Sequence, residues 1–256
     1  DRFMYLPSLG FCGLLAVSGD RLCRLRIRSR RLKGLCVLAA GLFLTGLGWI
    51  TFQQCQIWQG PDALWAAVLK RAPDNSIAHN NLGERRAYAG DHAQAIEYFT
   101  QAILLDPRNK EAYYNKGVSL TLSGQYEDAL QLLNQALQLD PDYAKALNNR
   151  GFLLSRVKNQ PGQALRDLDQ AVRIDPLLAE AYNNRGLARE QLGQPPGAAL
   201  QDYTAALALR PDLAEALYNR ALVNGEKLGR WAEAISDLSR AIATDPGYEE
   251  ALLSRG

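Results

Sequence analysis

The chain has 256 residues, with 29 basic and 27 acidic side chains and a formal net charge of +2 at pH 7. That average combines two unlike parts: residues 1–56 hold eight basic and two acidic residues (net +6), and the remaining 200 hold 21 basic and 25 acidic residues (net −4). The acidic balance of the longer part argues against nucleic acid as a partner. The pattern of cysteines, none of them in a CxxC pair, supports neither a zinc site nor a disulfide framework. All four lie in residues 1–56: Cys12, Cys23, Cys36 and Cys55.

Residues 1–56 have the composition of a membrane region. An apolar segment spans residues 5–19, and a basic segment with seven Arg and Lys residues spans 20–34. The segment after it carries no charge from Leu35 to Phe52. Its 18 residues would form a helix about 27 Å long, enough to cross the hydrocarbon core. We therefore predict a transmembrane helix over residues 35–53. A nucleic-acid-binding arm is the alternative interpretation of the basic segment, and the apolar segments on both sides favour a membrane loop.

The distribution of charge also predicts an orientation. Basic residues crowd the segment before the predicted transmembrane helix, and none follows it directly. Because positive loops stay in the cytoplasm, residues 20–34 are expected there and everything after about Gln53 on the extracytoplasmic side, periplasmic or luminal. The sequence thus predicts an integral membrane protein in contact with membrane lipid.

The rest of the chain repeats itself every 34 or 35 residues, and a period of this size predicts a solenoid. Motifs such as Asn149-Arg150-Gly151 recur in step with two columns of alanine and one of proline. The prolines are Pro107, Pro141, Pro176, Pro211 and Pro246. This is the pattern of a tetratricopeptide repeat, so we predict an all-α fold with a right-handed superhelix. We expect a capping half-repeat at 57–75, five repeats at 76–248 and the start of a sixth at 249–256.

The beginning of the chain resembles a particular family of repeat proteins. The segment Arg2-Phe3-Met4-Tyr5-Leu6-Pro7-Ser8 is similar to one that precedes the last membrane helices of the transmembrane and tetratricopeptide-repeat (TMTC) proteins. A basic loop, one membrane helix, Trp58, Pro73 and the first repeat then follow in the order found in that family. Because the sequence starts at Asp1 and stops within a repeat helix, we expect a C-terminal piece of a longer chain.

The TMTC resemblance implies a function for that longer chain. Members have a membrane-embedded glycosyltransferase domain with luminal repeats, and eukaryotic members transfer mannose from a lipid-linked donor to Ser or Thr of proteins. Their catalytic acidic residues lie in a loop outside this sequence, so no catalytic residue is assigned, and no metal or cofactor is expected. The resemblance places Asp1, Arg2 and Tyr5 near the lipid-sugar site. Anchoring at the membrane interface is the alternative role for these three residues.

A column of asparagine is the candidate binding site of the repeats. Counting each repeat so that its central Gly, or Ala221, is position 8, position 6 is always Asn and points about 160° away from the small residue. We expect this column to face the open, concave groove, where amides can donate to and accept from the backbone of an extended peptide. The pattern resembles the asparagine ladder of O-GlcNAc transferase. A solvated helix face that tolerates Asn is the alternative. The column is Asn81, Asn115, Asn149, Asn184 and Asn219.

Arginine at position 7 is accompanied by aspartate in the second helix of the same repeat. Repeats three to five carry both, whereas repeat one has Leu82 and Tyr98 and repeat two has Lys116 and Leu132. We predict partly buried, bidentate ion pairs between the two helices of one repeat. Unrelated solvated charges are the alternative. The three predicted pairs are Arg150 with Asp167, Arg185 with Asp202 and Arg220 with Asp237.

Together these features predict a membrane-anchored, extracytoplasmic module that binds proteins or extended peptides. The TMTC resemblance suggests the acceptor-recognition arm of an O-mannosyltransferase-like enzyme. A non-enzymatic scaffold for assembling an envelope protein complex is the alternative, because the repeat motifs themselves are generic to protein-binding solenoids.

Overall fold

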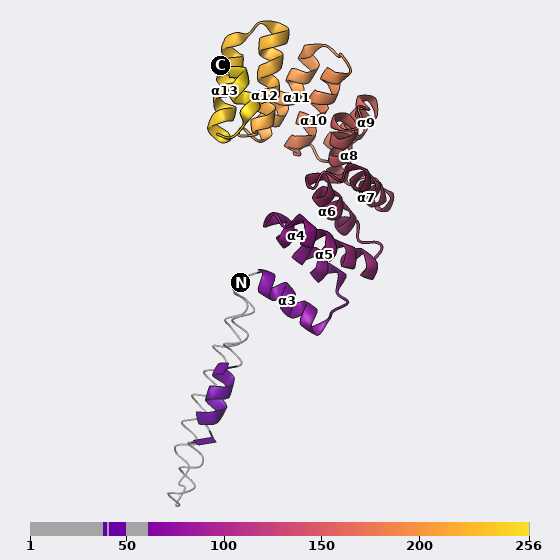
Figure 1. Ribbon diagram of the computed structural model, residues 1–256, viewed down its shortest axis with the longest axis vertical. Coiled ribbons are helices and arrows are strands. Elements are labelled where there is room, and N and C mark those ends of the chain that lie inside the picture. Colours follow the sequence, from indigo (N-terminus) through magenta and orange to yellow (C-terminus); the bar gives the residue numbers. More distant parts are fainter. Residues whose placement is uncertain (1–37, 40, 50–60, 256) are drawn as a thin grey trace, which may run out of the picture. The chain divides into compact units, whose positions relative to one another are not determined.

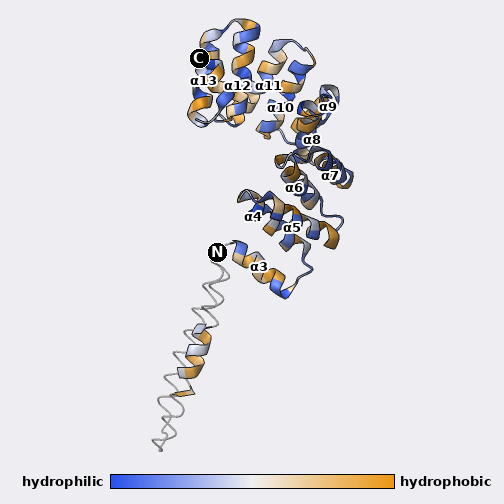
Figure 2. Ribbon diagram, in the orientation of Figure 1, coloured by the Kyte–Doolittle hydropathy of each residue, from blue (hydrophilic) through white to orange (hydrophobic). Residues whose placement is uncertain are grey.

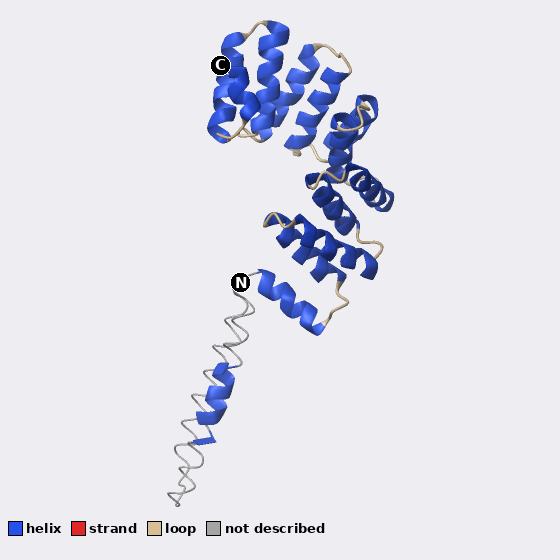
Figure 3. Cartoon of the chain, in the orientation of Figure 1, coloured by secondary structure: helices blue, strands red, loops and turns tan. Residues whose placement is uncertain are grey.

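The computed structural model describes residues 38–39, 41–49 and 61–255, and no strand occurs among them (Figure 3). The chain divides into two units, residues 1–63 and 64–256. Short helices joined by tight turns fill the second unit (Figure 1). The elements are α3 (Pro61–Arg71), α4 (Ser76–Tyr88), α5 (His92–Leu105), α6 (Lys110–Leu122), α7 (Tyr126–Leu139), α8 (Ala144–Arg156), α9 (Pro161–Ile174), α10 (Ala179–Gln191), α11 (Pro196–Leu209), α12 (Ala214–Leu222), the π-helical turn η1 (Val223–Lys227), α13 (Trp231–Thr244) and α14 (Glu249–Arg255).

The helices form a solenoid of helical hairpins. Within residues 76–244 the first helix of each repeat, helix A, packs on the second, helix B, as α4 packs on α5 and α8 on α9. Each helix B then packs on the next helix A, and α14 begins a sixth unit against α13. The repeat helices carry both hydrophilic and hydrophobic residues (Figure 2), as amphipathic helices with one packed face do. The repeat period read from the sequence is therefore a structural period.

The column of prolines ends every helix B in the same way. The residue before each proline is extended, with φ between −143° and −123° and ψ between 90° and 96°. Proline disfavours the helical conformation in the residue that precedes it, so the helix stops there. In four of the five turns that residue is aspartate, and its side chain accepts a backbone N–H two residues later, as Asp140 does from Asp142 at 3.0 Å. The turn is thus fixed by the local sequence.

The small residue at position 8 marks the closest approach of helix A to helix B. A Cβ added to Gly186 would lie 2.7 Å from Tyr203, and one added to Gly151 would lie 2.7 Å from Leu168. Gly117 has more room, with its facing leucine at 3.3 Å. The large residues that fill this space lie on helix B and are fully buried; they are Phe99, Leu133, Leu168 and Tyr203. The glycine column therefore exists because a bulky side chain of helix B lies against helix A.

Repeats three to five carry one extra residue between their helices, and they accommodate it in two ways. In repeat three the loop takes it up, with Asn159 at a positive φ of 52°. In repeat five helix A itself takes up the extra residue and widens into the π-helical turn η1. There the carbonyl of Asn224 accepts the N–H of Arg230 at 2.8 Å. A single π-helical turn is an unusual feature that often lies at functional sites.

The predicted membrane region falls largely outside the described residues. Residues 38–39 and 41–49, within the predicted transmembrane helix, are helical. No helix in the described part of the chain has both the length and the hydropathy of a membrane span. The segments 5–19 and 20–34 lie outside the described residues, as do Asp1, Arg2 and Tyr5. The transmembrane helix and the capping role of residues 57–75 stay predictions.

Candidate peptide-binding face and ion pairs

The asparagine column lies where the A helices of consecutive repeats meet. Each of its last four members donates its amide to the position-5 side chain of the preceding repeat. Asn115 donates to Asn80 at 3.1 Å, and Asn149 donates to the Tyr114 hydroxyl at 3.1 Å. The later pairs are Asn184 with Asn148 at 2.9 Å and Asn219 with Asn183 at 3.0 Å. Asn81, which begins the column, donates to the carbonyl of Ile77 in its own helix.

The prediction that this column faces an open groove is wrong at its C-terminal end. Asn184 is 9% exposed and Asn219 is 6% exposed, whereas Asn81, Asn115 and Asn149 are half-buried. A helical wheel places position 6 away from helix B, but it does not include the neighbouring helix A, against which this position packs. Since the amide N–H groups are used between repeats, the column primarily joins one repeat to the next.

The surface formed by α4, α6 and α8 contains a hollow. We call it the A-face hollow; its volume is about 390 Å³. Tyr88 and Leu122 stand at its edge with 87% and 65% of their surfaces exposed. The lining comes from three consecutive A helices and from α5: Glu84, Ala87, Tyr88, His92, Phe99, Tyr114, Asn115, Val118, Ser119, Leu122 and Lys145.

Polar groups in the A-face hollow are held in fixed positions. One oxygen of Glu84 accepts the amides of Asn80 at 3.1 Å and Asn115 at 2.7 Å. The hydroxyl of Ser119, which is 1% exposed, has no hydrogen-bond partner in the described part of the chain. Burial raises the pKa of Tyr114, although the amide that it accepts from Asn149 opposes that rise. The hollow therefore combines two exposed apolar side chains with a fixed acceptor and an unused hydroxyl.

The structure contains all three arginine–aspartate pairs expected from the sequence. Arg150 donates to Asp167 through Nε at 2.7 Å and Nη2 at 2.8 Å, so this pair is bidentate. The pair in repeat five has the same form, with both distances at 2.8 Å. In repeat four the Nη2 of Arg185 reaches Asp202 at 2.6 Å. The aspartates of repeats four and five are buried, with side chains 3% and 7% exposed, so these are not solvated charges.

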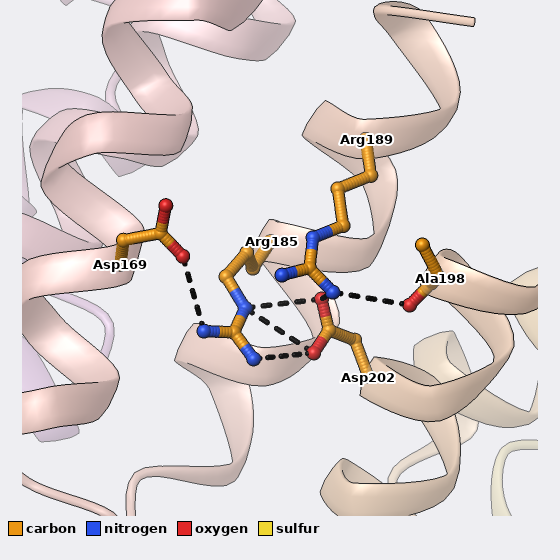
Figure 4. A network of polar contacts seen from close by, with 5 residues as sticks. All are labelled: Asp169, Arg185, Arg189, Ala198 and Asp202. Carbon is orange, nitrogen blue, oxygen red and sulfur yellow. Dashed lines mark hydrogen bonds and ion pairs between the residues drawn. The ribbon is translucent and has the colours of Figure 1, made fainter. Parts of the chain in front are cut away.

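Two of these arginines also bind the preceding repeat. The comparison of the repeats with one another did not predict these contacts. The Nη1 of Arg185 donates to Asp169 on α9 at 3.1 Å, while Arg189 contacts Asp202 at 3.0 Å and the carbonyl of Ala198 at 3.2 Å (Figure 4). Arg150 similarly donates to Asn134 on α7 at 2.8 Å. The signal lay in polar side chains at one shared position of helix B, Asn134 in α7 and Asp169 in α9. These networks join three helices rather than two.

The residues that fill the same positions in repeat two behave differently. Lys116 is half-buried, and desolvation lowers its pKa.

His79, at the packing position 4 of repeat one, lies 6.1 Å from the ring of Tyr98 and contacts the carbonyl of Pro73 at 2.9 Å. Within the described residues, no group of three or more His, Cys, Asp or Glu side chains is arranged to hold a metal ion.

Comparison with protein families identifies the repeats. A model of the tetratricopeptide repeat matches residues 81–144, 156–214 and 196–249. Among curated proteins, human protein O-mannosyl-transferase TMTC1 is 27% identical over 108 residues, which cover 42% of this chain and 12% of that protein. The Caenorhabditis elegans protein O-mannosyl-transferase F38B6.6 is 32% identical over 107 residues, 42% of this chain and 14% of that protein. The similarity thus spans about an eighth of the length of these relatives.

Solved structures show the same fold. PilW, described as a type IV pilus biogenesis factor, matches with a TM-score of 0.62 and 24% identity over 70% of this chain and 81% of its own. YrrB, described as having an unusual peptide-binding site, matches with a TM-score of 0.54 and 22% identity over 75% of this chain and 97% of its own. At these identities the likeness concerns the architecture alone.

Proposed function

The chain belongs to the tetratricopeptide repeat family, and from that membership we propose that its repeats bind an extended polypeptide across the A-face hollow. The observation that carries this proposal is the exposure of Tyr88 and Leu122 beside polar groups that can accept further hydrogen bonds. Tyrosine is enriched among the residues that contribute most of the binding energy in protein interfaces, and Leu122 adds exposed apolar area beside Tyr88. The peptide contacts the hollow rather than the whole asparagine column.

The polar groups of the hollow suit a peptide backbone. Glu84 is oriented by two amides, and its second oxygen accepts no hydrogen bond within the described residues, so it is available to a peptide N–H. The side-chain oxygen of Asn115 likewise has no partner there, whereas the unpaired hydroxyl of Ser119 is buried beneath the surface. Contacts to backbone groups depend little on the side chains of the ligand, so this site favours extended conformation over a particular sequence.

The wider role that we propose follows from the relatives. The similarity to protein O-mannosyl-transferases supports a module that presents acceptor polypeptides to a membrane-embedded transferase. In this proposal residues 35–53 cross the membrane, and the repeats lie on the extracytoplasmic side in contact with the enzyme's acceptors. A scaffold that assembles other proteins would use the same hollow, and only transfer of a sugar to a bound peptide separates the two roles.

A matched pair of leucine substitutions tests binding at the hollow. Leu122 and Leu104 are equally exposed, at 65% and 68%, but Leu104 lies on helix α5 and does not line the hollow. For a peptide selected from a random display library against the full chain, Leu122→Ala should weaken binding by about 1–2 kcal/mol, or roughly 5- to 30-fold. Leu104→Ala should leave the affinity unchanged. Equal effects of the two substitutions would place the peptide elsewhere.

A further inference from the structure

A second, larger recess lies between α11 and α13, which are the B helices of repeats four and five. We call it the α11–α13 groove. Its volume is about 900 Å³, compared with about 360 Å³ for the corresponding recess between α7 and α9. It opens to solvent and is lined by Leu200, Gln201, Thr204, Arg220, Asn224, Arg230, Ala232, Glu233, Ser236, Asp237 and Arg240. None of these residues belongs to the A-face hollow, so the groove is a separate surface.

Two substitutions relative to the earlier repeats open this groove. Where repeat four has Arg189, whose guanidinium contacts Asp202 at 3.0 Å, repeat five has the shorter Asn224. Where α7 and α9 have Asn134 and Asp169, which bind the arginine of the next repeat, α11 has Thr204. Asn224 also lies in the π-helical turn, so the backbone of helix A differs here as well.

As a result, one edge of the Arg220 guanidinium makes no hydrogen bond within the described residues. Arg220 uses Nε and Nη2 on Asp237, as the other two arginines do on their aspartates. Its Nη1, which in Arg150 and Arg185 donates to the preceding repeat, has no hydrogen-bond partner within the described residues and is not buried. The Asp237 pair holds the guanidinium in place, so the free N–H groups keep a fixed direction toward the groove.

The charges around this edge favour an anion. The groove is lined by three arginines and two acids, whereas the repeats as a whole are acidic. Arg240 is held over the groove by the carbonyl of Pro211 at 2.9 Å and lies 3.6 Å from Asp237. The side chain of Arg230 has no partner in the described part of the chain. A guanidinium edge with fixed geometry recognises carboxylates well, through charge-assisted hydrogen bonds.

From this arrangement we infer that the α11–α13 groove binds an acidic segment of a partner polypeptide, with one carboxylate on Nη1 of Arg220. The groove is open to solvent, with a volume of about 900 Å³, and the neutral hydrogen-bonding groups of Gln201, Thr204 and Ser236 suit a peptide backbone. The contact is independent of the A-face hollow, so a polypeptide bound there and an acidic segment bound here would not compete.

Substitution of Thr204 tests this inference while leaving the ion pair of Arg220 with Asp237 intact. Thr204→Asp copies Asp169, which occupies the same position of α9 in repeat three, and would satisfy Nη1 within the protein while adding a negative charge. Gln135→Glu adds the same charge to an exposed position of α7 outside the groove and serves as the control. The probe is a rhodamine-labelled peptide of six glutamates, compared with its six-glutamine counterpart, measured by fluorescence anisotropy with the full chain.

We expect the glutamate peptide to bind about tenfold more tightly than the glutamine peptide at about 50 mM salt, and to weaken as salt increases. Thr204→Asp should reduce that affinity about tenfold, and Gln135→Glu should change it less than twofold. Equal binding of the two peptides, or an unchanged affinity in Thr204→Asp, would overturn the inference. Binding of inorganic phosphate that Thr204→Asp abolishes, without binding of the peptide, would overturn the choice of occupant.

Discussion

Asp202 is the residue whose replacement tests the ion-pair networks most sharply. Its carboxylate accepts from Nη2 of Arg185 at 2.6 Å and contacts Arg189 at 3.0 Å, and the side chain is 3% exposed. Asp202→Asn keeps the shape and one acceptor oxygen but removes the charge. Two guanidinium groups, 15% and 21% exposed, then lose their main counter-charge while they remain largely buried.

The expected cost follows from this burial. Removing one partner of a buried pair destabilises a protein by about 3–5 kcal/mol, because the other charge stays buried without compensation. Asp169 still contacts Arg185, so the lower end of that range, about 3 kcal/mol, is expected. Asp169 itself is 49% exposed, and Asp169→Asn should cost no more than about 1 kcal/mol. The two substitutions remove the same charge beside the same arginine and differ in burial.

Urea unfolding followed by circular dichroism measures the total loss, and hydrogen exchange of α10 and α11 localises it, because repeat arrays need not unfold in a single step. Arg185→Leu combined with Asp202→Tyr copies Leu82 and Tyr98 of repeat one and should recover most of the stability lost in Asp202→Asn. Equal losses in Asp202→Asn and Asp169→Asn would refute the role assigned to burial. A double variant as unstable as the single one would show that the two positions are not exchangeable between repeats.

Three further predictions concern titration, packing and topology. Burial raises the pKa of Glu190 above its ordinary value of 4.5. The folded state therefore keeps this proton to a higher pH than the unfolded state does. The resulting stability is fully present below about pH 4.5 and is lost as the pH rises through the raised pKa. Glu190→Gln keeps an acceptor for the Tyr203 hydroxyl and should remove that loss, so thermal unfolding of the two proteins should differ at pH 7 and converge at pH 4; parallel curves would contradict this. Gly151→Ala should cost about 1–3 kcal/mol in urea unfolding, because the new Cβ would lie 2.7 Å from the facing leucine, whereas Gly117→Ala, with 3.3 Å available, should cost less. A cysteine at Gln135, an exposed position, should react with an impermeant thiol reagent in intact cells or spheroplasts, and labelling only after lysis would exclude extracytoplasmic repeats.

The sequence predicted those features that every repeat must satisfy by itself. Proline ends each helix B through a local conformational restriction. Glycine stands at position 8 because a large side chain of the same hairpin leaves little room for a Cβ there. The arginine–aspartate pairs could be predicted for a similar reason. Both residues appear together in three repeats and are absent from repeat one, so the comparison among repeats identified two positions that meet.

Features that depend on neighbouring repeats were harder to predict. The helical wheel placed Asn184 correctly relative to its own hairpin and missed the adjacent helix A that buries it. The A-face hollow was missed because Glu84, Leu122 and Lys145 come from three repeats, and no single period of the sequence contains it. The π-helical turn of repeat five was missed because an insertion can be taken up by a loop or by a helix, and the residue count is the same in both.

Photo-crosslinking from one position of the hollow tests binding at this face most directly. Benzoylphenylalanine replaces Leu122 in one version of the full chain and Leu104 in another, and each is irradiated in intact cells. Both positions are similarly exposed, so the two probes should form non-specific crosslinks to the same extent. The proposed function predicts polypeptide adducts from position 122 that position 104 does not form and that an excess of the selected peptide prevents. Identical adducts from both positions, or adducts that the peptide does not displace, would contradict it.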